Sequence, residues 1–294
     1  MKLNNFFNQA IYFGRLMDPR KNKAKIINFP DSAIHYGNPN LEVKKIMVGI
    51  DIEVGDLLLA EHVRKNDGLD LVVAHHPEGR AFVNLHEVMR LQVDLLTQAG
   101  VAQSTASGLM EQRMLEVQRR ILSQNHTRPV DAARLLDMPF INLHTPADNH
   151  VYHYLNNLFK SKKASSLLLE DLVKILLTIP EYQAAQKFET GPQIIMGNPK
   201  RKVGKILLEM TGGTEGSKDV FDKLYKAGVR TLVSMHLSEE HFKKAKDANL
   251  NVVIAGHISS DNLGLNLLLD NIEKSAKQTF PVVACSGFIR IKRK

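Results

Sequence analysis

The sequence predicts a two-domain α/β protein, in which a smaller α/β domain is inserted into a discontinuous first domain built on a mainly parallel sheet. Short apolar runs alternate with stretches of helical period along most of the chain, which is typical of parallel strands joined by helices. Three of these runs, 71–74, 140–143 and 252–255, lead into histidine and aspartate. The length of 294 residues is sufficient for one large or two ordinary domains.

Helices and strands alternate in the first half of the chain. Apolar side chains on one side of residues 4–17 predict a short amphipathic helix, and the polar, basic stretch 18–39 predicts a loop. Pro129 suits the start of a helix predicted at 129–136, because the N–H group that it lacks has no partner in a first turn. The other expected elements are strands at 43–52, 69–74 and 140–143 and helices at 54–65, 89–99, 110–123 and 149–164.

A second, smaller α/β unit is predicted after the polar residues 161–163. Its expected elements are a mostly helical stretch at 167–189, strands at 193–196, 204–210 and 230–234, and helices at 217–227 and 239–249. The chain then returns to the first domain, and the expected elements there are a strand at 252–255, a helix at about 262–277 and a strand at 280–290. We therefore assign residues 1–165 and 250–294 to the first domain and residues 166–249 to the inserted one.

Composition predicts a cytoplasmic protein that does not enter membranes. Hydrophobic residues make up 44% of the chain, but no apolar run approaches the roughly 18 to 20 residues that a membrane helix needs. Residues 1–20 show no secretory signal. The single cysteine, Cys285, excludes an intramolecular disulfide and fits a reducing compartment.

The formal net charge of +8 allows two interpretations. The surface could be a mixed one, since 31 acidic residues accompany 39 basic ones, or the charge could attract an anionic partner. Nucleic acid is not expected as the main partner, because the sequence has no tryptophan and no zinc-finger, KH or RNP-type motif. The charge favours a small anionic or phosphorylated substrate.

Imidazole and carboxylate side chains follow three predicted strands. His75 and His76 come directly after 71–74, and the other two strands lead into His144 and His257. In open parallel α/β sheets, binding sites form outside the carboxyl ends of the strands. Three strand ends of this composition predict one shared metal site.

The His75-His76 pair is the first candidate ligand set. Where a strand ends, the alternation of its side chains breaks down, so adjacent imidazoles can bind two different ions. Pro77 ends the strand because it cannot donate to the sheet. The alternative is two ordinary surface histidines in a loop, but the preceding apolar strand favours metal binding.

Asp148 and His144 form the second candidate set. A carboxylate such as Asp148 can bridge two divalent ions, but it could instead cap a helix beginning at Asn149. His144 could be a ligand, a loop residue, or an outer residue that orients a ligating carboxylate, and we expect the last role.

His257 and Asp261 form the third set. Their four-residue spacing spans one helical turn, so both can face one ion, with Ser259 or Ser260 as the helix N-cap. The alternative is that Asp261 only complements the helix dipole. His236 follows the strand predicted at 230–234 and could reach the site from the inserted domain as a proton donor; a solvated position is its alternative.

The glycine-rich segment 211–217 follows a predicted strand and precedes a helix. It lacks the phosphate-binding and dinucleotide-binding spacings, so an ordinary tight turn is favoured over an anion-binding loop.

In their order along the chain, these motifs resemble those of the NIF-three-like dinuclear metal-centre family. The motifs are His75-His76-Pro77, residues 144–148 and residues 256–264, and the resemblance covers most of the chain from about Val43. It implies two divalent ions in a two-domain α/β subunit, and a ring-shaped homohexamer whose metal sites face an internal cavity. The ligands that it implies are His75, His76, Asp148, His257 and Asp261, the last at a position where the family usually has glutamate.

The residues favour a metal-dependent hydrolase that acts on a phosphorylated or nucleotide-like small molecule through a metal-activated water. His144 or His236 would move the leaving-group proton. Imidazole and carboxylate ligands suit zinc, iron or manganese, and no thiolate is available to favour zinc. The alternative is a metal store, metal chaperone or regulatory scaffold with the same ligands and no turnover. Members of the family are often called GTP cyclohydrolase 1 type 2 homologues, but no residue argues for that reaction and we do not adopt it.

Overall fold

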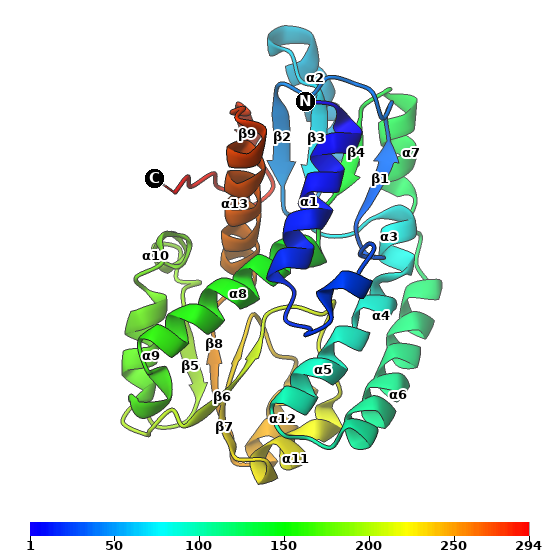
Figure 1. Ribbon diagram of the computed structural model, residues 1–294. Helices are drawn as coiled ribbons and strands as arrows, with labels where there is room; N and C mark the ends of the chain where they lie inside the picture. Colours follow the sequence, from blue (N-terminus) through cyan, green and yellow to red (C-terminus); the bar gives the residue numbers. More distant parts are fainter. Residues whose placement is uncertain (294) are drawn as a thin grey trace.

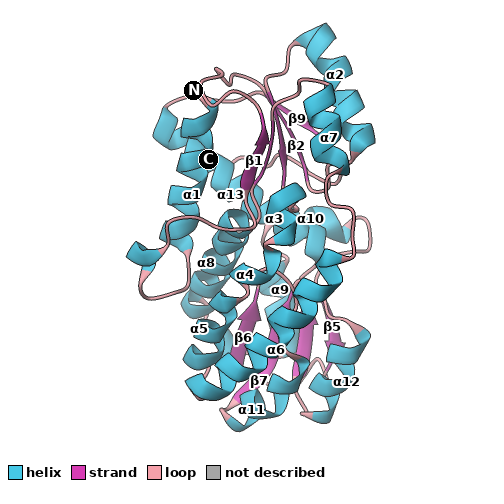
Figure 2. Cartoon of the chain, turned by 90° about the vertical axis from the view of Figure 1, so that its right-hand side faces the viewer, coloured by secondary structure: helices cyan, strands magenta, loops and turns pink. Residues whose placement is uncertain are grey.

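The computed structural model describes residues 1–293 and contains two β-sheets at opposite ends of an elongated molecule (Figure 1). Figure 2 shows that helices surround both sheets. This is the two-sheet α/β architecture that the alternation of strands and helices predicts. No helix among the described residues is long and apolar enough to span a membrane.

The first sheet has five strands and is mainly parallel. Its spatial order is β1 (Ala33–Tyr36), β4 (Phe140–Asn142), β3 (Leu71–Ala74), β2 (Ile46–Gly49) and β9 (Val282–Ala284). The strands β2, β3 and β4 are completely buried, which explains their continuous apolar sequences. Only β1 is antiparallel to its neighbour, and it lies at the edge of the sheet.

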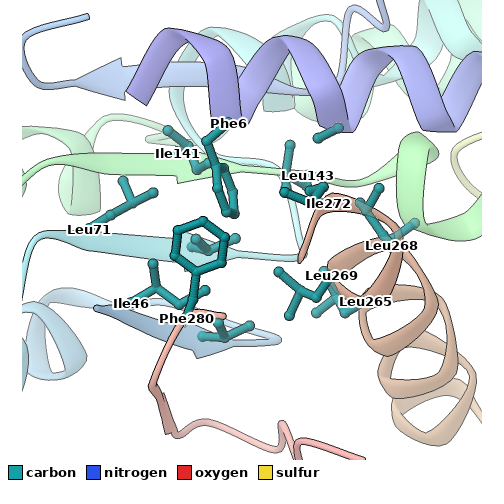
Figure 3. Packing of buried hydrophobic residues seen from close by; sticks show 14 of the residues in the cluster. Phe6, Ile46, Leu71, Ile141, Leu143, Leu265, Leu268, Leu269, Ile272 and Phe280 are labelled. Atoms are coloured by element: carbon teal, nitrogen blue, oxygen red, sulfur yellow. The ribbon is translucent and has the colours of Figure 1, made fainter. Parts of the chain in front are cut away.

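Helices cover both faces of the first sheet. The helices α1 (Leu3–Met17), α8 (Thr145–Ser161) and α13 (His257–Ala276) contribute to the apolar cluster on one face, and α2 (Val54–Asp67) and α7 (Arg128–Leu135) to the cluster on the other. Figure 3 shows the first of these clusters, where the rings of Phe6 and Phe280 meet edge to face at 5.4 Å. Alternate residues of each strand serve the two clusters, so Val73 faces one and Val72 the other.

The second sheet has four strands. Its order is β5 (Gln193–Met196), β8 (Asn251–Ile254), β7 (Val229–Ser234) and β6 (Lys205–Glu209). β6, β7 and β8 are parallel, and β5 is an antiparallel edge strand.

Two groups of helices sandwich the second sheet. The cluster on one face includes α5 (Arg90–Gln98), α6 (Gln103–Leu122), α11 (Phe221–Lys226) and α12 (Glu239–Asp247). The cluster on the other includes the later part of α8, α9 (Leu169–Leu176) and α10 (Pro180–Gln186). The remaining helical segments are α3 (Gly79–Val83), α4 (Leu85–Val88) and three 3-10 turns, Lys23–Lys25, Ala164–Ser166 and Lys218–Val220.

Sheet membership differs from the prediction at one strand. The run predicted at 252–255 was assigned to the first domain, but β8 pairs with β7 in the second sheet. A buried Val-Val-Ile run can complete either sheet, because its apolar sequence does not specify a partner. The chain crosses back at Gly256, whose φ of 107° favours glycine. The helices α5 and α6, predicted in the first domain, also pack on the second sheet. The limits 1–165 plus 250–294 and 166–249 are otherwise untested and stay a prediction.

Two further differences concern the ends of the first sheet. The stretch 18–39, predicted as a loop, contains β1, whose partly buried residues show no clear alternation. The final strand, predicted at 280–290, is confined to Val282–Ala284, and the residues that follow leave the sheet.

Candidate metal centre

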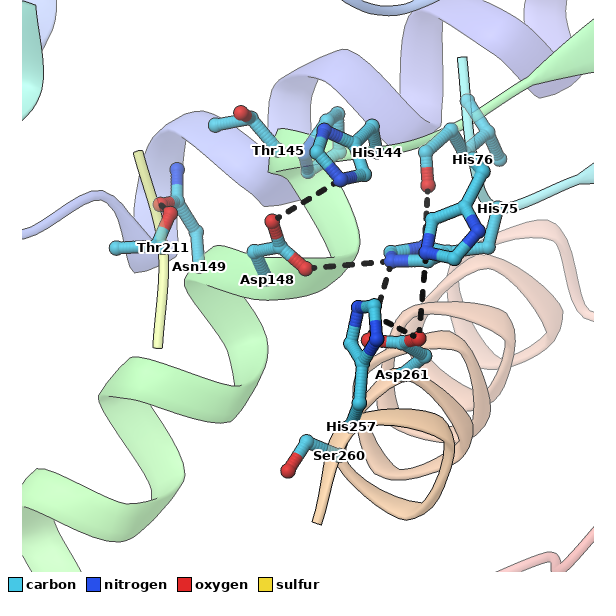
Figure 4. Close-up of polar contacts among 12 residues, drawn as sticks. His75, His76, His144, Thr145, Asp148, Asn149, Thr211, His257, Ser260 and Asp261 are labelled. Atoms are coloured by element: carbon cyan, nitrogen blue, oxygen red, sulfur yellow. Dashed lines mark hydrogen bonds and ion pairs between the residues drawn. The ribbon is translucent and has the colours of Figure 1, made fainter. Parts of the chain in front are cut away.

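The carboxyl ends of β3 and β4 meet the amino ends of α8 and α13 at one point, where the polar side chains in Figure 4 converge. His75 and His76 follow β3, and Asp148 lies in the first turn of α8. His257 and Asp261 lie at the start of α13. The sheet edge therefore gathers the residues of all three predicted sets.

Both helices begin earlier than predicted. His144 is the N-cap of α8, so Asp148 lies inside the helix and the alternative role as a cap for a helix at Asn149 is wrong. Gly256 is the N-cap of α13, in place of Ser259 or Ser260. An early start turns the acidic side chains back toward the strand ends, because helical side chains point toward the amino end.

The distances between the donor atoms fit a shared cation. His75 Nε2 lies 3.4 Å from Asp148 Oδ1 and 3.4 Å from Asp261 Oδ1. Asp261 Oδ2 lies 3.5 Å from His76 Nε2 and 3.6 Å from His257 Nε2. Two N or O ligands about 2.1 Å from one ion at tetrahedral angles stand about 3.4 Å apart. The spacing is compatible with donor atoms around a metal ion.

Several of these atoms are buried and have no hydrogen-bond partner. They are His75 Nε2, Asp148 Oδ1 and both carboxylate oxygens of Asp261. His75 is 0% exposed and Asp261 1% exposed. A buried carboxylate without partners is unfavourable unless a cation compensates it. The donor set thus fits a metal ion, and the cluster can hold one.

Three of the histidines are oriented through their other ring nitrogen. A neutral His75 can donate Nδ1–H to the carbonyl of Leu143, 3.2 Å away, which leaves the Nε2 lone pair facing the carboxylates. His76 Nδ1 is 2.6 Å from Asp51 Oδ1, and His144 Nδ1 is 2.7 Å from Asp31 Oδ2. Such outer contacts select the tautomer and orientation of ligating histidines.

Asp31 and Asp51 were missed in the sequence analysis. Asp51 follows β2 just as His75 follows β3, so the rule of strand ends could have found it. Asp31 is 0% exposed and also accepts the hydroxyl hydrogen of Thr145 at 2.6 Å. It lies in the stretch predicted as a loop, where no pattern marks it.

In this cluster, protons and a cation would compete for the same histidine nitrogens. Burial lowers the pKa of His75, but Asp261 and Asp148 outweigh it and raise this pKa well above its usual value. Burial lowers the pKa of His76 too, but the carboxylates of Asp261 and Asp51 outweigh it and raise this pKa to about 9. Burial lowers the pKa of His257 to about 4. A cation bound by His75 and His76 would displace protons from them.

His236 reaches the centre from the second sheet. Its ring lies 4.8 Å from that of His257, centroid to centroid. Its Nδ1 is 3.4 Å from Glu215 Oε1, and the second oxygen of Glu215 lies 3.3 Å from His241 Nδ1. Burial raises the pKa of Glu215, but His236 and His241 lower it to about 2. Glu215 was also missed, although it lies in the glycine-rich segment 211–217.

Comparison with known proteins identifies the family. The structure of a NIF3 superfamily protein from Sphaerobacter thermophilus is 29% identical to the chain, with a TM-score of 0.80 over 96% of this chain and 98% of that one. This likeness over nearly the whole chain supports a NIF3-like family assignment. No family model and no curated protein matches the sequence.

Two more distant structures share the NIF3-like fold. Reduced HcgD from Methanocaldococcus jannaschii is 15% identical with a TM-score of 0.54, and the match covers 97% of each chain. A protein from Thermus thermophilus is 13% identical with a TM-score of 0.52, and its match also covers 97% of each chain. At these identities the likeness concerns the fold alone.

The NIF3-like fold explains why residues far apart in sequence converge. All seven residues singled out for the site gather at one edge of the first sheet or face it from the second: His75, His76, His144, Asp148, His236, His257 and Asp261. The glycine-rich segment adjoins the site through Glu215, and its turn is held by Gln92 of α5, which donates to the carbonyls of Gly212 and Thr214. That contact favours the prediction of an ordinary turn.

Proposed function

We propose that the chain binds a pair of divalent ions and is a metal-dependent hydrolase that acts on a phosphorylated or nucleotide-like small molecule. The observation that carries the proposal is the set of buried, unpaired donor atoms that face one another. Together with the less buried His76 and His257, these residues form two groups that share one residue: His75 with Asp148 and Asp261, and His76 with His257 and Asp261.

The shared residue supports a pair of ions over a single one. The two oxygens of Asp261 point to different partners, Oδ1 to His75 and Oδ2 to His76 and His257. A carboxylate used in this way bridges two ions. We predicted this role for Asp148, but the geometry of Asp261 supports it better.

The ligand chemistry suits zinc, iron or manganese, because the two groups offer imidazole nitrogen and carboxylate oxygen without thiolate. When bound, such a pair of ions would lower the pKa of water toward neutrality and neutralise charge on a phosphate. The net charge of +8 favours an anionic substrate.

The side of the centre formed by His257 and His76 is open to a substrate. Their side chains are 40% and 23% exposed, whereas those of His75 and Asp148 are buried. His236 stands on this open side, beside His257. Glu215 lies beside Nδ1 of His236 and would keep that nitrogen protonated. Nε2 of His236 would then be free to exchange the proton of a leaving group.

His144 has two roles open to it. It belongs to a third group with His75 and His76, so it could complete the ligands of one ion. Alternatively, with Nδ1 paired to Asp31, its Nε2 could move a proton. Bound metal in a His144→Ala variant would distinguish a ligand, which loses metal, from a proton carrier, which keeps it.

A metal store or regulatory scaffold is the second candidate function. All three residues of the group His75, Asp148 and Asp261 are buried. Structural metal sites are closed in this way, whereas catalytic sites keep an open coordination position. This candidate predicts full metal content with no turnover of any substrate.

The test is elemental analysis of the purified chain, followed by a screen of phosphoesters and nucleotides. We expect about two ions per chain, as in two-metal hydrolases, and a loss of metal in His75→Ala and Asp148→Ala. His236→Ala should keep its metal and lose most of its turnover. An absence of bound metal after reconstitution with zinc, iron and manganese would refute the proposal.

A further inference from the structure

Residues of α10, of the first two turns of α13 and of the segment after β9 line a cavity. Its volume of about 540 Å³ is within the range of small-molecule sites. Most of its lining is apolar and includes Ala184, Ala185, Phe188, Ile258, Phe288 and Ile289. None of the five residues proposed as metal ligands lines it.

The apolar lining continues onto the surface. Phe188 is 74% exposed, Ile289 46% and Ile258 41%, and all three line the cavity. They come from three segments that are distant in sequence. Large apolar side chains gathered around a hollow mark a binding surface more often than single exposed ones do.

One buried polar atom in the lining has no partner. Ser259 is 6% exposed, and its Oγ makes no hydrogen bond. It lies in the first turn of α13, where backbone N–H groups lack intrahelical acceptors and no side chain caps them. A buried hydroxyl without a partner is unfavourable, so an acceptor brought by a ligand would be stabilised there.

Two larger polar side chains of the lining, Asn262 and Glu181, are already paired. Asn262 donates to the carbonyls of Ile258 and Gly287 and accepts from the N–H of Ile289. Glu181 is paired with Arg293. The chemistry that the cavity offers is therefore an apolar chamber with a hydrogen-bond donor at Ser259.

We propose that this cavity is a second small-molecule site, for a compound with an apolar body of about the size of a fused aromatic ring and one anionic or carbonyl head that accepts from Ser259. The site is separate from the metal ligands, and its occupation does not depend on the hydrolase proposed above. The start of α13 also carries His257, and Asp261 follows one turn later; both side chains belong to the metal centre.

Fluorescence titration with 8-anilinonaphthalene-1-sulfonate tests the proposal, because this probe combines an aromatic body with a sulfonate acceptor. We expect saturable binding to a single site per chain. Ala184→Leu fills the cavity and should weaken binding at least about tenfold, since overpacking excludes the ring. Ser259→Ala removes one hydrogen bond and should weaken it about threefold to tenfold.

Gln183→Leu is the matched control. Gln183 is an exposed neighbour of Ala184 on the same helix and does not line the cavity, so this substitution introduces the same side chain outside the cavity. The variant should bind the probe as the native chain does. Equal weakening in Gln183→Leu and Ala184→Leu, or unchanged affinity in Ser259→Ala, would overturn the proposal. So would a change of oligomeric state in Ala184→Leu by light scattering, which would assign the groove to a contact between copies.

Discussion

Asp261 occupies the position where the resemblance implies a longer glutamate, and its shorter side chain still reaches three histidines. The reason is local: α13 begins at His257, so Asp261 lies one turn into the helix and its carboxylate points back toward the strand ends. The carboxylate is 1% exposed and makes no hydrogen bond. Burial raises its pKa, but His75 and His76 outweigh this and hold the pKa of Asp261 well below its usual range.

Asp261 belongs to both groups of donor atoms and Asp148 to one, so their substitution should remove different amounts of metal. Asp261→Asn retains the shape but removes the charge from both groups of donor atoms, and we expect it to lose both ions. Asp148→Asn affects one group and should leave the ion held by His76, His257 and Asp261. Elemental analysis of the two variants makes the comparison. Equal metal content in both would rule out the bridge.

A substitution at Asp31 would separate the effect of orienting His144 from the effect of binding the metal ion directly. Asp31 contacts His144 Nδ1 but belongs to none of the three donor groups. Asp31→Asn should weaken metal affinity about 10- to 100-fold while saturating metal restores full occupancy. Competition with a metal-binding dye gives the affinity. Asp70→Asn, which disturbs only the backbone contacts of Lys44 and Lys45, is the control.

At this scale, the convergence of side chains was predictable where they follow a recognisable strand, whereas their roles as metal ligands stay predictions. His75, His76 and Asp148 were found because apolar runs indicate the sheet edge on which they lie. Asp31 and Glu215 were missed, because their role depends on which histidine lies beside them after folding, and no local pattern carries that information.

Among the strands, the edge strand β1 is the one that prediction missed, and it carries His35. His35 Nε2 lies 2.9 Å from Asn142 Oδ1 in the neighbouring strand β4. Burial lowers the pKa of His35 to about 4, and the contact with Asn142 only partly opposes this. The unfolded chain, with a histidine pKa near its usual value of about 6.5, binds this proton more tightly than the folded chain does.

Acid should therefore destabilise the chain through His35. Its contribution to the free energy of unfolding is complete above about pH 6.5 and is lost as the pH falls toward 4. His35→Gln cannot take up the proton, so its urea midpoint should fall less between pH 7 and pH 5 than that of the native chain. The exposed His62→Gln is the control. Parallel profiles for His35→Gln and the native chain would contradict this account.

Element types were more predictable than element limits. Buried parallel strands need continuous apolar runs, so β2, β3 and β4 were placed from sequence. The starts of α8 and α13 were placed four and five residues late, because His144 and Gly256 are unusual caps that resemble loop residues. β1 was missed because four partly buried residues provide too short a pattern.

At the scale of the molecule, the proposed centre joins segments from distant parts of the chain. Its ligands come from the loop after β3 and from the first turns of α8 and α13. Bound ions would therefore stabilise the folded chain, by up to about 4 kcal/mol per site at a thousandfold excess over Kd. Chelation should lower the Tm of the native chain by at least about 5 °C. The Asp261→Asn variant, from which we expect both ions to be lost, should show little further change, and an equal shift in it and in the native chain would place the metal elsewhere.

Domain limits were the least predictable feature at this scale. A strand such as β8 is apolar whichever sheet receives it, and α5 and α6 cover a sheet that is formed by a later part of the sequence. These choices depend on contacts between distant segments. The hexamer implied by the resemblance also stays a prediction, which light scattering can test.

The helix α8 gives the molecule one more property. Ala147 near its start packs in the core of the first sheet, whereas Val151, Leu155 and Phe159 pack against the second. In α8, Asp148 lies between Ala147 and these three residues. A hinge motion of one sheet relative to the other would have to rotate or bend this helix, and Asp148 would move with it. Opening of the molecule and release of an ion would then be a single event, so a chain holding metal should be more rigid than one stripped of it.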